Sequence, residues 1–244
     1  MISAVARQLC YSFNKSLRSS ENSRIYSVLS GNNAKINFLR TVSPLCTKAG
    51  DKKINYAALG IEAEATGDLS KAIQLFTRAI EHETNPVRCN IIRQVRADVY
   101  RNNKQYDEAF NDLLPLLEDE NCRFPVATYR LLSFTWQDCD NDFQAIRFLE
   151  RGIKDLPEDL SLHYDVGKLY LRNANSMQAR SHFEIVSKIC DEDSYLKSDD
   201  NLMKLIKYLR EAILPKIETA SAEELCWFYS GLTQAEKKFP SSSL

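Results

Sequence analysis

The sequence predicts an all-α fold in which helical hairpins stack into a solenoid. Small residues recur at intervals of 34 to 37 residues, and each is followed twelve residues later by an alanine. A repeat of this size is typical of hairpins that bury their apolar faces only by stacking on one another. The low contents of glycine and proline, 7 of each in 244 residues, also favour helices. The four pairs are Gly60 with Ala72, Ala97 with Ala109, Ser133 with Ala145, and Gly167 with Ala179.

The first predicted hairpin shows why small residues recur. Two antiparallel helices approach closely only where small side chains face each other, while larger apolar residues fill the gaps between layers. Tyr56, Leu59 and Gly60 share one face of a first helix, and Gly67-Asp68 makes the turn. On the second helix, the residues at i, i+4 and i+7 are Ala72, Phe76 and Ala79.

The next three hairpins repeat this pattern. The second is the weakest, because Arg93 and Arg96 stand where apolar residues are expected. The residues of this hairpin that keep the small and apolar pattern are Ala97, Tyr100, Ala109, Leu113 and Leu116. The third consists of Tyr129, Leu132, Ser133, Trp136, Ala145, Leu149 and Gly152, and ends at Pro157. The fourth consists of His163, Val166, Gly167, Tyr170, Ala179, Phe183 and Val186.

In these positions the chain resembles the tetratricopeptide repeat family. The resemblance covers residues 53–193, in units 53–86, 90–123, 126–159 and 160–193. It implies a right-handed superhelix with a concave groove that binds other molecules and does not catalyse a reaction. The alanines of the second helices are 37, 36 and 34 residues apart, which predicts lengthened loops at 83–87 and 118–124.

Residues 194–244 keep a helical period without the repeat signature, which predicts a helical cap followed by a short tail. Pro215 is expected to end or kink the first cap helix, and Ser221 with Glu224 predicts a capping box at the start of the last helix. The apolar stripes of the two helices are Leu202, Leu205, Ile206, Leu209 and Ile213, and then Leu225, Trp227, Phe228 and Leu232.

The first 48 residues differ from the remainder in charge. They carry seven basic residues and one acid, a net charge of +6, whereas the remainder carries −7. Wound as a helix, residues 1–26 place Val5, Leu9, Phe13 and Leu17 on one side and Arg7, Lys15 and Arg18 on the other. This arginine-rich, serine-rich and acid-poor segment resembles a mitochondrial presequence, which implies a matrix protein.

A processing site and a leader follow this segment. Arg24-Ile25-Tyr26-Ser27 resembles a matrix-processing site with cleavage after Tyr26, and residues 27–50 are then a flexible leader. A disordered basic tail on a cytoplasmic protein is the alternative. No stretch reaches the roughly 18 to 20 apolar residues of a transmembrane helix.

Catalytic and cofactor motifs are not found. The sequence has no phosphate-binding glycine loop, dinucleotide fingerprint or nucleophile elbow, so we expect no enzyme activity and no cofactor. The seven cysteines include no C-x-x-C pair, and we expect reduced thiols and no metal site. His163 is expected to be structural, and His82 and His182 solvated. Asp138, Asp140 and Asp142 are interpreted as a solvated turn.

The resemblance transfers a binding groove onto the first helices of the four units. The expected groove residues, unit by unit, are Ile54, Ala57, Ile61, Glu64 and Ala65; Ile91, Gln94, Asp98, Arg101 and Asn102; Ala127, Arg130, Phe134, Gln137 and Asp138; and Ser161, Tyr164, Lys168, Leu171 and Arg172. Towards the C-terminal end this groove is basic, which suits an acidic or carboxylate-bearing protein segment. The alternative is that these side chains only make an exposed face soluble.

Two other uses of such a groove are disfavoured. Co-chaperones of the family clamp a C-terminal carboxylate with lysine and asparagine, but the matching positions here hold Ala57, Ile61 and Val95. Other helical-hairpin repeats read single-stranded RNA, so an RNA-associated organelle factor is the rival function. The charge of −7 outside the first 48 residues disfavours nucleic acid as a partner.

Overall fold

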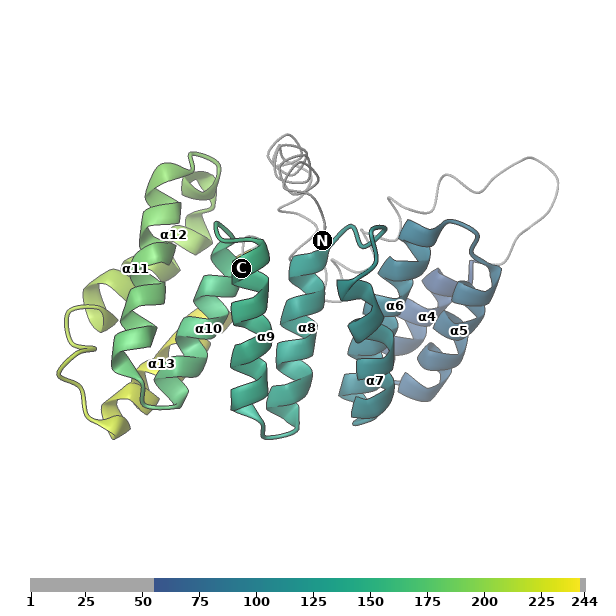
Figure 1. The fold of residues 1–244 in the computed structure, drawn as a ribbon, viewed down its shortest axis with the longest axis horizontal. Coiled ribbons are helices and arrows are strands. Elements are labelled where there is room, and N and C mark those ends of the chain that lie inside the picture. Colours follow the sequence, from purple (N-terminus) through teal and green to yellow (C-terminus); the bar gives the residue numbers. More distant parts are fainter. Residues whose placement is uncertain (1–54, 242–244) are drawn as a thin grey trace.

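The computed structural model of the chain describes residues 55–241, which form ten α-helices and no strand (Figure 1). The paired helices are α4 (Tyr56–Ala65), α5 (Leu69–His82), α6 (Pro86–Asn102), α7 (Tyr106–Leu113), α8 (Pro125–Asp138), α9 (Asp142–Asp155), α10 (Leu160–Arg172) and α11 (Ser176–Glu192). The last two are α12 (Asp200–Tyr208) and α13 (Ala222–Lys238). The expected presequence, processing site and leader, and groove residue Ile54, lie outside the described residues.

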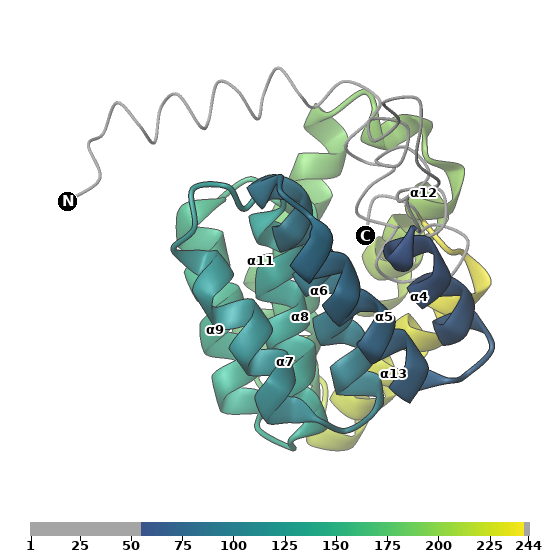
Figure 2. The same ribbon diagram turned by 90° about the vertical axis from the view of Figure 1, so that its right-hand side faces the viewer.

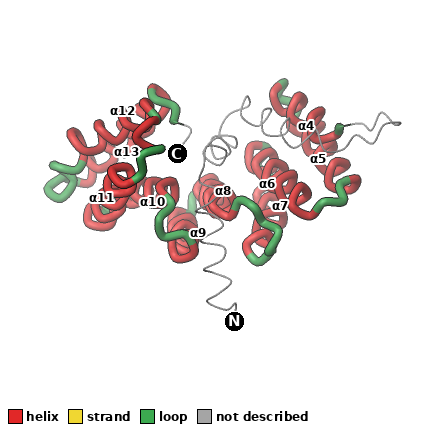
Figure 3. Tube along the Cα trace, turned by 90° about the horizontal axis from the view of Figure 1, so that it is seen from above, coloured by secondary structure: helices red, strands yellow, loops and turns green. Residues whose placement is uncertain are grey.

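Helices α4 to α11 form four hairpins that stack side by side along a curve. The first helix of each hairpin lies on the inner side of the curve and the second on the outer side (Figure 3). Seen from the α4–α5 end, α7 and α9 lie to one side of the stack and α12 and α13 to the other (Figure 2). The predicted all-α solenoid of helical hairpins is therefore confirmed for the described part of the chain.

Close approach of the two helices in a hairpin depends on the recurring small residues. All eight are buried, and a Cβ atom added to Gly60 would lie 2.8 Å from Cε1 of Phe76. The fourth hairpin has the same geometry, because a Cβ atom on Gly167 would lie 2.7 Å from Cε1 of Phe183. Each glycine thus makes room for a phenylalanine ring of its partner helix, which is itself fully buried.

The turns inside the hairpins share a feature that is not evident from their residues. Each has three residues, and the middle one has a positive φ angle: 82° at Gly67, 60° at Lys104, 56° at Asp140 and 55° at Ala174. A left-handed residue ends a helix by turning the chain away from the helix axis. Because only the first turn contains glycine, the other three accept a conformation that costs a non-glycine residue roughly 1 kcal/mol.

The predicted lengthened loop at 83–87 is wrong. Only residues 83–85 separate α5 from α6, and the extra residues lie in α6, which has 17 residues where α8 has 14. Helix α6 begins at Pro86, a residue suited to the first helical position because it has no N–H to leave unpaired. The second lengthened connection lies where it was predicted, between the 3₁₀ turn Leu114–Leu117 and α8.

The second hairpin tolerates an arginine at an apolar position because Arg96 is paired. Its Nε and Nη2 atoms donate to the two carboxylate oxygens of Asp112 on α7, at 2.8 and 2.6 Å. Its Nη1 donates to the Thr77 hydroxyl at 2.9 Å, and its guanidinium lies over the ring of Tyr100. The ion pair therefore joins α6 to α7 through charge-assisted hydrogen bonds.

The C-terminal segment returns to the inner side of the curve. Helix α12 continues into a π-helical turn, Leu209–Ile213, and the helix ends there, ahead of Pro215. The predicted capping box of α13 is confirmed: Ser221 Oγ accepts from the N–H of Glu224, and the Glu224 carboxylate accepts from the N–H of Ser221. Helix α13 then packs against α10 and α12 (Figures 1 and 3). None of the helices described between residues 55 and 241 has the length and hydropathy of a transmembrane span.

Replacing Gly167 by leucine tests the close approach. The added side chain collides with the buried ring of Phe183, so we expect the free energy of unfolding to fall by at least about 2 kcal/mol in urea denaturation followed by helical circular dichroism. Ser181→Leu, which places the same side chain at an exposed position of α11, should alter it by less than about 0.5 kcal/mol. Equal effects of the two variants would contradict this packing.

Candidate binding surface

The expected groove positions lie on the inner helices, but their exposure varies along each helix. Many positions ahead of the helix ends are buried, including Ile91, Gln94, Ala127 and Tyr164. The most accessible positions are the last residues of the four first helices, which we call the terminal strip: Ala65 (α4), Asn102 (α6), Asp138 (α8) and Arg172 (α10). The first three are exposed and Arg172 is partly exposed.

The cation of the second unit is held by two carboxylates. Arg101 donates from Nη2 to Asp98 at 2.9 Å on its own helix, and from Nη1 to Asp138 on α8 at 2.7 Å. Asp98 is buried, whereas the Asp138 side chain is 40% exposed. Arg101 therefore ties α6 to α8 across the boundary between two hairpins.

A second contact across the same boundary is buried. The Gln94 side-chain amide donates to the carbonyl oxygen of Phe124 at 2.9 Å and to the Thr128 hydroxyl at 2.7 Å. Because the expected binding residue Gln94 is only 2% exposed, its amide stabilises the stack.

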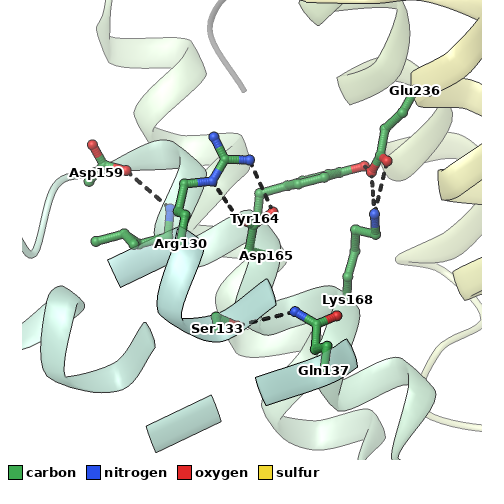
Figure 4. Close-up of polar contacts among 9 residues, drawn as sticks. Arg130, Ser133, Gln137, Asp159, Tyr164, Asp165, Lys168 and Glu236 are labelled. Atoms are coloured by element: carbon green, nitrogen blue, oxygen red, sulfur yellow. Dashed lines mark hydrogen bonds and ion pairs between the residues drawn. The ribbon is translucent and has the colours of Figure 1, made fainter. Parts of the chain in front are cut away.

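Arg130 of the third unit is also paired one unit along. Its Nε donates to Asp165 of α10 at 2.6 Å, and both side chains are largely buried (Figure 4). The guanidinium lies 5.6 Å from the centre of the half-buried Phe134 ring. Gln137, the next expected groove residue, donates to the Ser133 hydroxyl of its own helix at 3.2 Å.

The fourth unit meets the chain's own last helix. Lys168 Nζ lies 2.7 and 2.9 Å from the two carboxylate oxygens of Glu236 on α13, and the Tyr164 hydroxyl donates to the same carboxylate at 2.7 Å (Figure 4). Burial, and then the negative charge of Glu236, raise the pKa of Tyr164 well above its ordinary value. Tyr164 therefore stays a hydrogen-bond donor at neutral pH.

Arg172 is held between a carboxylate and an aromatic ring. Its Nε donates to Asp142 of α9 at 2.7 Å, and its Nη2 makes a second contact with the same carboxylate. Asn173 donates to Asp142 as well, at 2.8 Å. The guanidinium lies 5.7 Å from the centre of the Tyr229 ring of α13. Asp142, interpreted from the sequence as part of a solvated turn, instead positions Arg172.

These contacts change the chemistry expected of the surface. Each of the four cations, Arg101, Arg130, Lys168 and Arg172, already has a carboxylate partner within the chain. An acidic partner would therefore compete with these carboxylates and would not meet free positive charge. The sequence did hold a signal for two of the pairs, since Asp138 and Asp165 each follow their arginine by about one repeat.

The histidines differ partly from expectation. His163 is buried, as expected of a structural residue, and its Nε2 lies 3.0 Å from the carbonyl oxygen of Pro157. A carbonyl oxygen only accepts, so Nε2 of neutral His163 donates and its Nδ1 accepts from Nδ1 of His182 at 2.9 Å. His82 is exposed, but His182 is only partly exposed and stacks on Tyr170. The expectation that His182 is solvated is wrong.

Within residues 55–241 no group of three or more His, Cys, Asp or Glu side chains is placed to hold a metal ion. The cysteines described there, Cys89, Cys122, Cys139, Cys190 and Cys226, are free thiols.

No protein-family model and no curated protein matches the sequence. Two solved structures with a similar arrangement are crystal structures of MamA. The first covers 75% of this chain and 91% of its own at 17% identity, with a TM-score of 0.44. The second covers 74% and 95% at 16% identity, with the same TM-score. A likeness at this level carries no argument about function, which must come from the surface itself.

A double-mutant cycle tests the role of Arg130. Arg130→Met leaves the Asp165 carboxylate buried without its partner, so we expect a loss of about 2 to 3 kcal/mol in the free energy of unfolding. Arg130→Met with Asp165→Leu should recover most of that loss, because no unpaired charge remains. At the exposed pair Lys188–Glu192, Lys188→Met should cost less than about 0.5 kcal/mol. Equal losses at the two pairs would contradict this assignment.

His182 makes the stability depend on pH. Burial, and then His163, lower its pKa from 6.5 to about 4 in the folded chain, so the unfolded chain binds more protons between these pH values. The stability from the neutral ring is present above pH 6.5 and is lost as the pH falls towards 4. From pH 7 to 5 the free energy of unfolding should fall by about 1 kcal/mol more in the wild type than in His182→Gln.

Urea denaturation at pH 7 and pH 5 measures this difference. His82→Gln, at an exposed position, is the matched control and should follow the wild type more closely than His182→Gln does. An equal fall in the wild type and in His182→Gln would contradict the assignment.

Proposed function

We propose that this chain is a non-enzymatic scaffold that binds another protein along the inner side of its curve. The observation that carries the proposal is the terminal strip. One accessible position recurs at the end of every inner helix: Ala65 and Asn102 are exposed outside the ion pairs described above, and Asp138 and Arg172 are accessible members of such pairs. A repeated accessible row on a rigid support suits contact with an extended or helical segment.

We propose an acidic segment as the partner, and the chain's own contacts support this choice. Lys168 and Tyr164 already receive a carboxylate, that of Glu236, by charge-assisted hydrogen bonds. Arg101, at the exposed end of α6, binds Asp138, whose side chain is 40% exposed and can be replaced there by another carboxylate. Pairs open to water contribute little net energy, so such an exchange costs little.

We propose the mitochondrial matrix as the location, with residues 1–26 as presequence and 27–50 as leader. The support is the arginine-rich amphipathic pattern of residues 1–26 and the net charge of +6 over residues 1–48.

Proximity labelling in cells with the full-length chain tests the proposal. The variant combines Ala65→Glu and Asn102→Glu, two exposed positions of the terminal strip that take part in none of the ion pairs described above. Added negative charge repels an acidic partner, so we expect labelling of at least one neighbouring protein to fall about tenfold.

The matched control combines Ser70→Glu and Ser181→Glu, at exposed positions of the outer helices α5 and α11, and should leave the labelled proteins unchanged. The same profile from the strip variant and the wild type would contradict binding at the strip. Cytosolic neighbours would contradict the location, and salt-dependent retention of the full chain on single-stranded RNA would favour the rival function.

A further inference from the structure

We infer that α13 occupies a binding seat on α10, and that the partner is an amphipathic helix which replaces α13 in that seat. The inference rests on the proposed function and names the class of partner more narrowly. The seat consists of the inner face of α10 around Tyr164, Lys168 and Arg172, bounded by Tyr208 of α12. Its occupant presents an apolar residue, an aromatic residue, a second apolar residue and a carboxylate, at i, i+4, i+7 and i+11.

This pattern is the face that α13 turns towards the seat. Leu225, Tyr229, Leu232 and Glu236 have the stated spacing and fall within one narrow stripe of a helix. Leu225 and Leu232 are buried in the same apolar cluster as Tyr164. The hydrophobic effect has no directional preference, so other apolar side chains could replace the two leucines. The leucines therefore contribute affinity, and Tyr229 and Glu236 contribute selectivity.

The polar contacts of the seat recognise one carboxylate in a defined place. Glu236 receives three hydrogen bonds, two from Lys168 at 2.7 and 2.9 Å and one from Tyr164 at 2.7 Å. The centre of the Tyr229 ring lies near two cations of α10, 5.6 Å from Lys168 Nζ and 5.7 Å from Arg172 Cζ. A helix that carries an aromatic residue and, two turns later, a carboxylate can therefore contact both Lys168 and Arg172.

The contacts of α13 are suited to exchange. The two cations are equally buried, but the Glu236 side chain is 30% exposed whereas Asp165 in the Arg130 pair is only 10% exposed, so water reaches the α13 carboxylate more easily. A helix that reproduces the stripe covers the apolar surface of α10 that α13 leaves, so only the freedom that the partner loses on binding has to be offset by its contacts. Two further bonds hold the end of the segment and must open: Asn201 to the carbonyl oxygen of Pro240, and Ser241 to Asp199.

Helix α13 can be loosened from either side. Glu236→Lys places two like charges together at Lys168 and weakens the contact with α10. Gly231→Leu acts on the other side, because any side chain at Gly231 collides with the Tyr208 hydroxyl of α12. Hydrogen exchange of the α13 amides then shows whether the helix has left its seat.

The test uses a fluorescent synthetic peptide with the sequence of residues 219–241, titrated into the full-length chain. We expect the two loosened variants to bind it at least tenfold more tightly than the wild type does. Glu236→Gln in the peptide should weaken binding at least tenfold. Trp227→Ala in the peptide is the matched control and should change nothing, since Trp227 is 70% exposed on the outer face of α13. A chain with Lys168→Glu should prefer a peptide with Glu236→Lys.

Three results would overturn the inference. The first is unchanged exchange of the α13 amides in both variants, because the helix would then not be displaceable. The second is a released α13 with no binding of the peptide. The third is self-association of the loosened chains in place of peptide binding, because the occupant would then be a second copy. None of these results would affect binding at Ala65 and Asn102, so the proposed function is tested separately.

Discussion

Close approach between the two helices of a hairpin is the constraint on which the rest of this structure depends. Gly60 and Gly167 leave room for the rings of Phe76 and Phe183, and the alanines that recur on the second helices are fully buried. Dense contact of this kind turns four short helix pairs, none of which buries enough apolar surface alone, into one curved stack. The inner helices are thereby presented side by side, so residues one repeat apart come within hydrogen-bonding reach.

Ion pairs between successive units follow from that arrangement. Arg101 reaches Asp138 and Arg130 reaches Asp165, each from one inner helix to the next. The same side chains that look like ligands for an acidic partner therefore orient the units relative to one another. The terminal strip, where the inner helices end, remains accessible, whereas the seat on α10 is covered by α13.

Local features of this fold were predictable from the sequence, and the long-range polar contacts were not. The small-residue repeat predicts the hairpins because each spacing lies within one helix pair, and Ser221 with Glu224 predicts the start of α13 because a capping box spans only four residues. The three extra residues of α6 were assigned to a loop, since the interval between two alanines does not say which element between them is longer. The pairing of Lys168 with Glu236 joins residues 68 positions apart, and no periodicity connects them. Likewise, the environment of His182 depends on His163 and Tyr170, which lie on a different helix.

Coupling between the paired small and large residues is the most direct test of this account. The free energy of unfolding is measured for Gly60→Ala and Phe76→Leu, singly and together, by urea denaturation. If Gly60 makes room for the Phe76 ring, the methyl group of Gly60→Ala should cost less stability once that ring is replaced by leucine. The loss in free energy of unfolding of the double variant should then be smaller than the sum of the two single losses by about 1 kcal/mol. Additive effects, within about 0.3 kcal/mol, would contradict close approach as the basis of the stack.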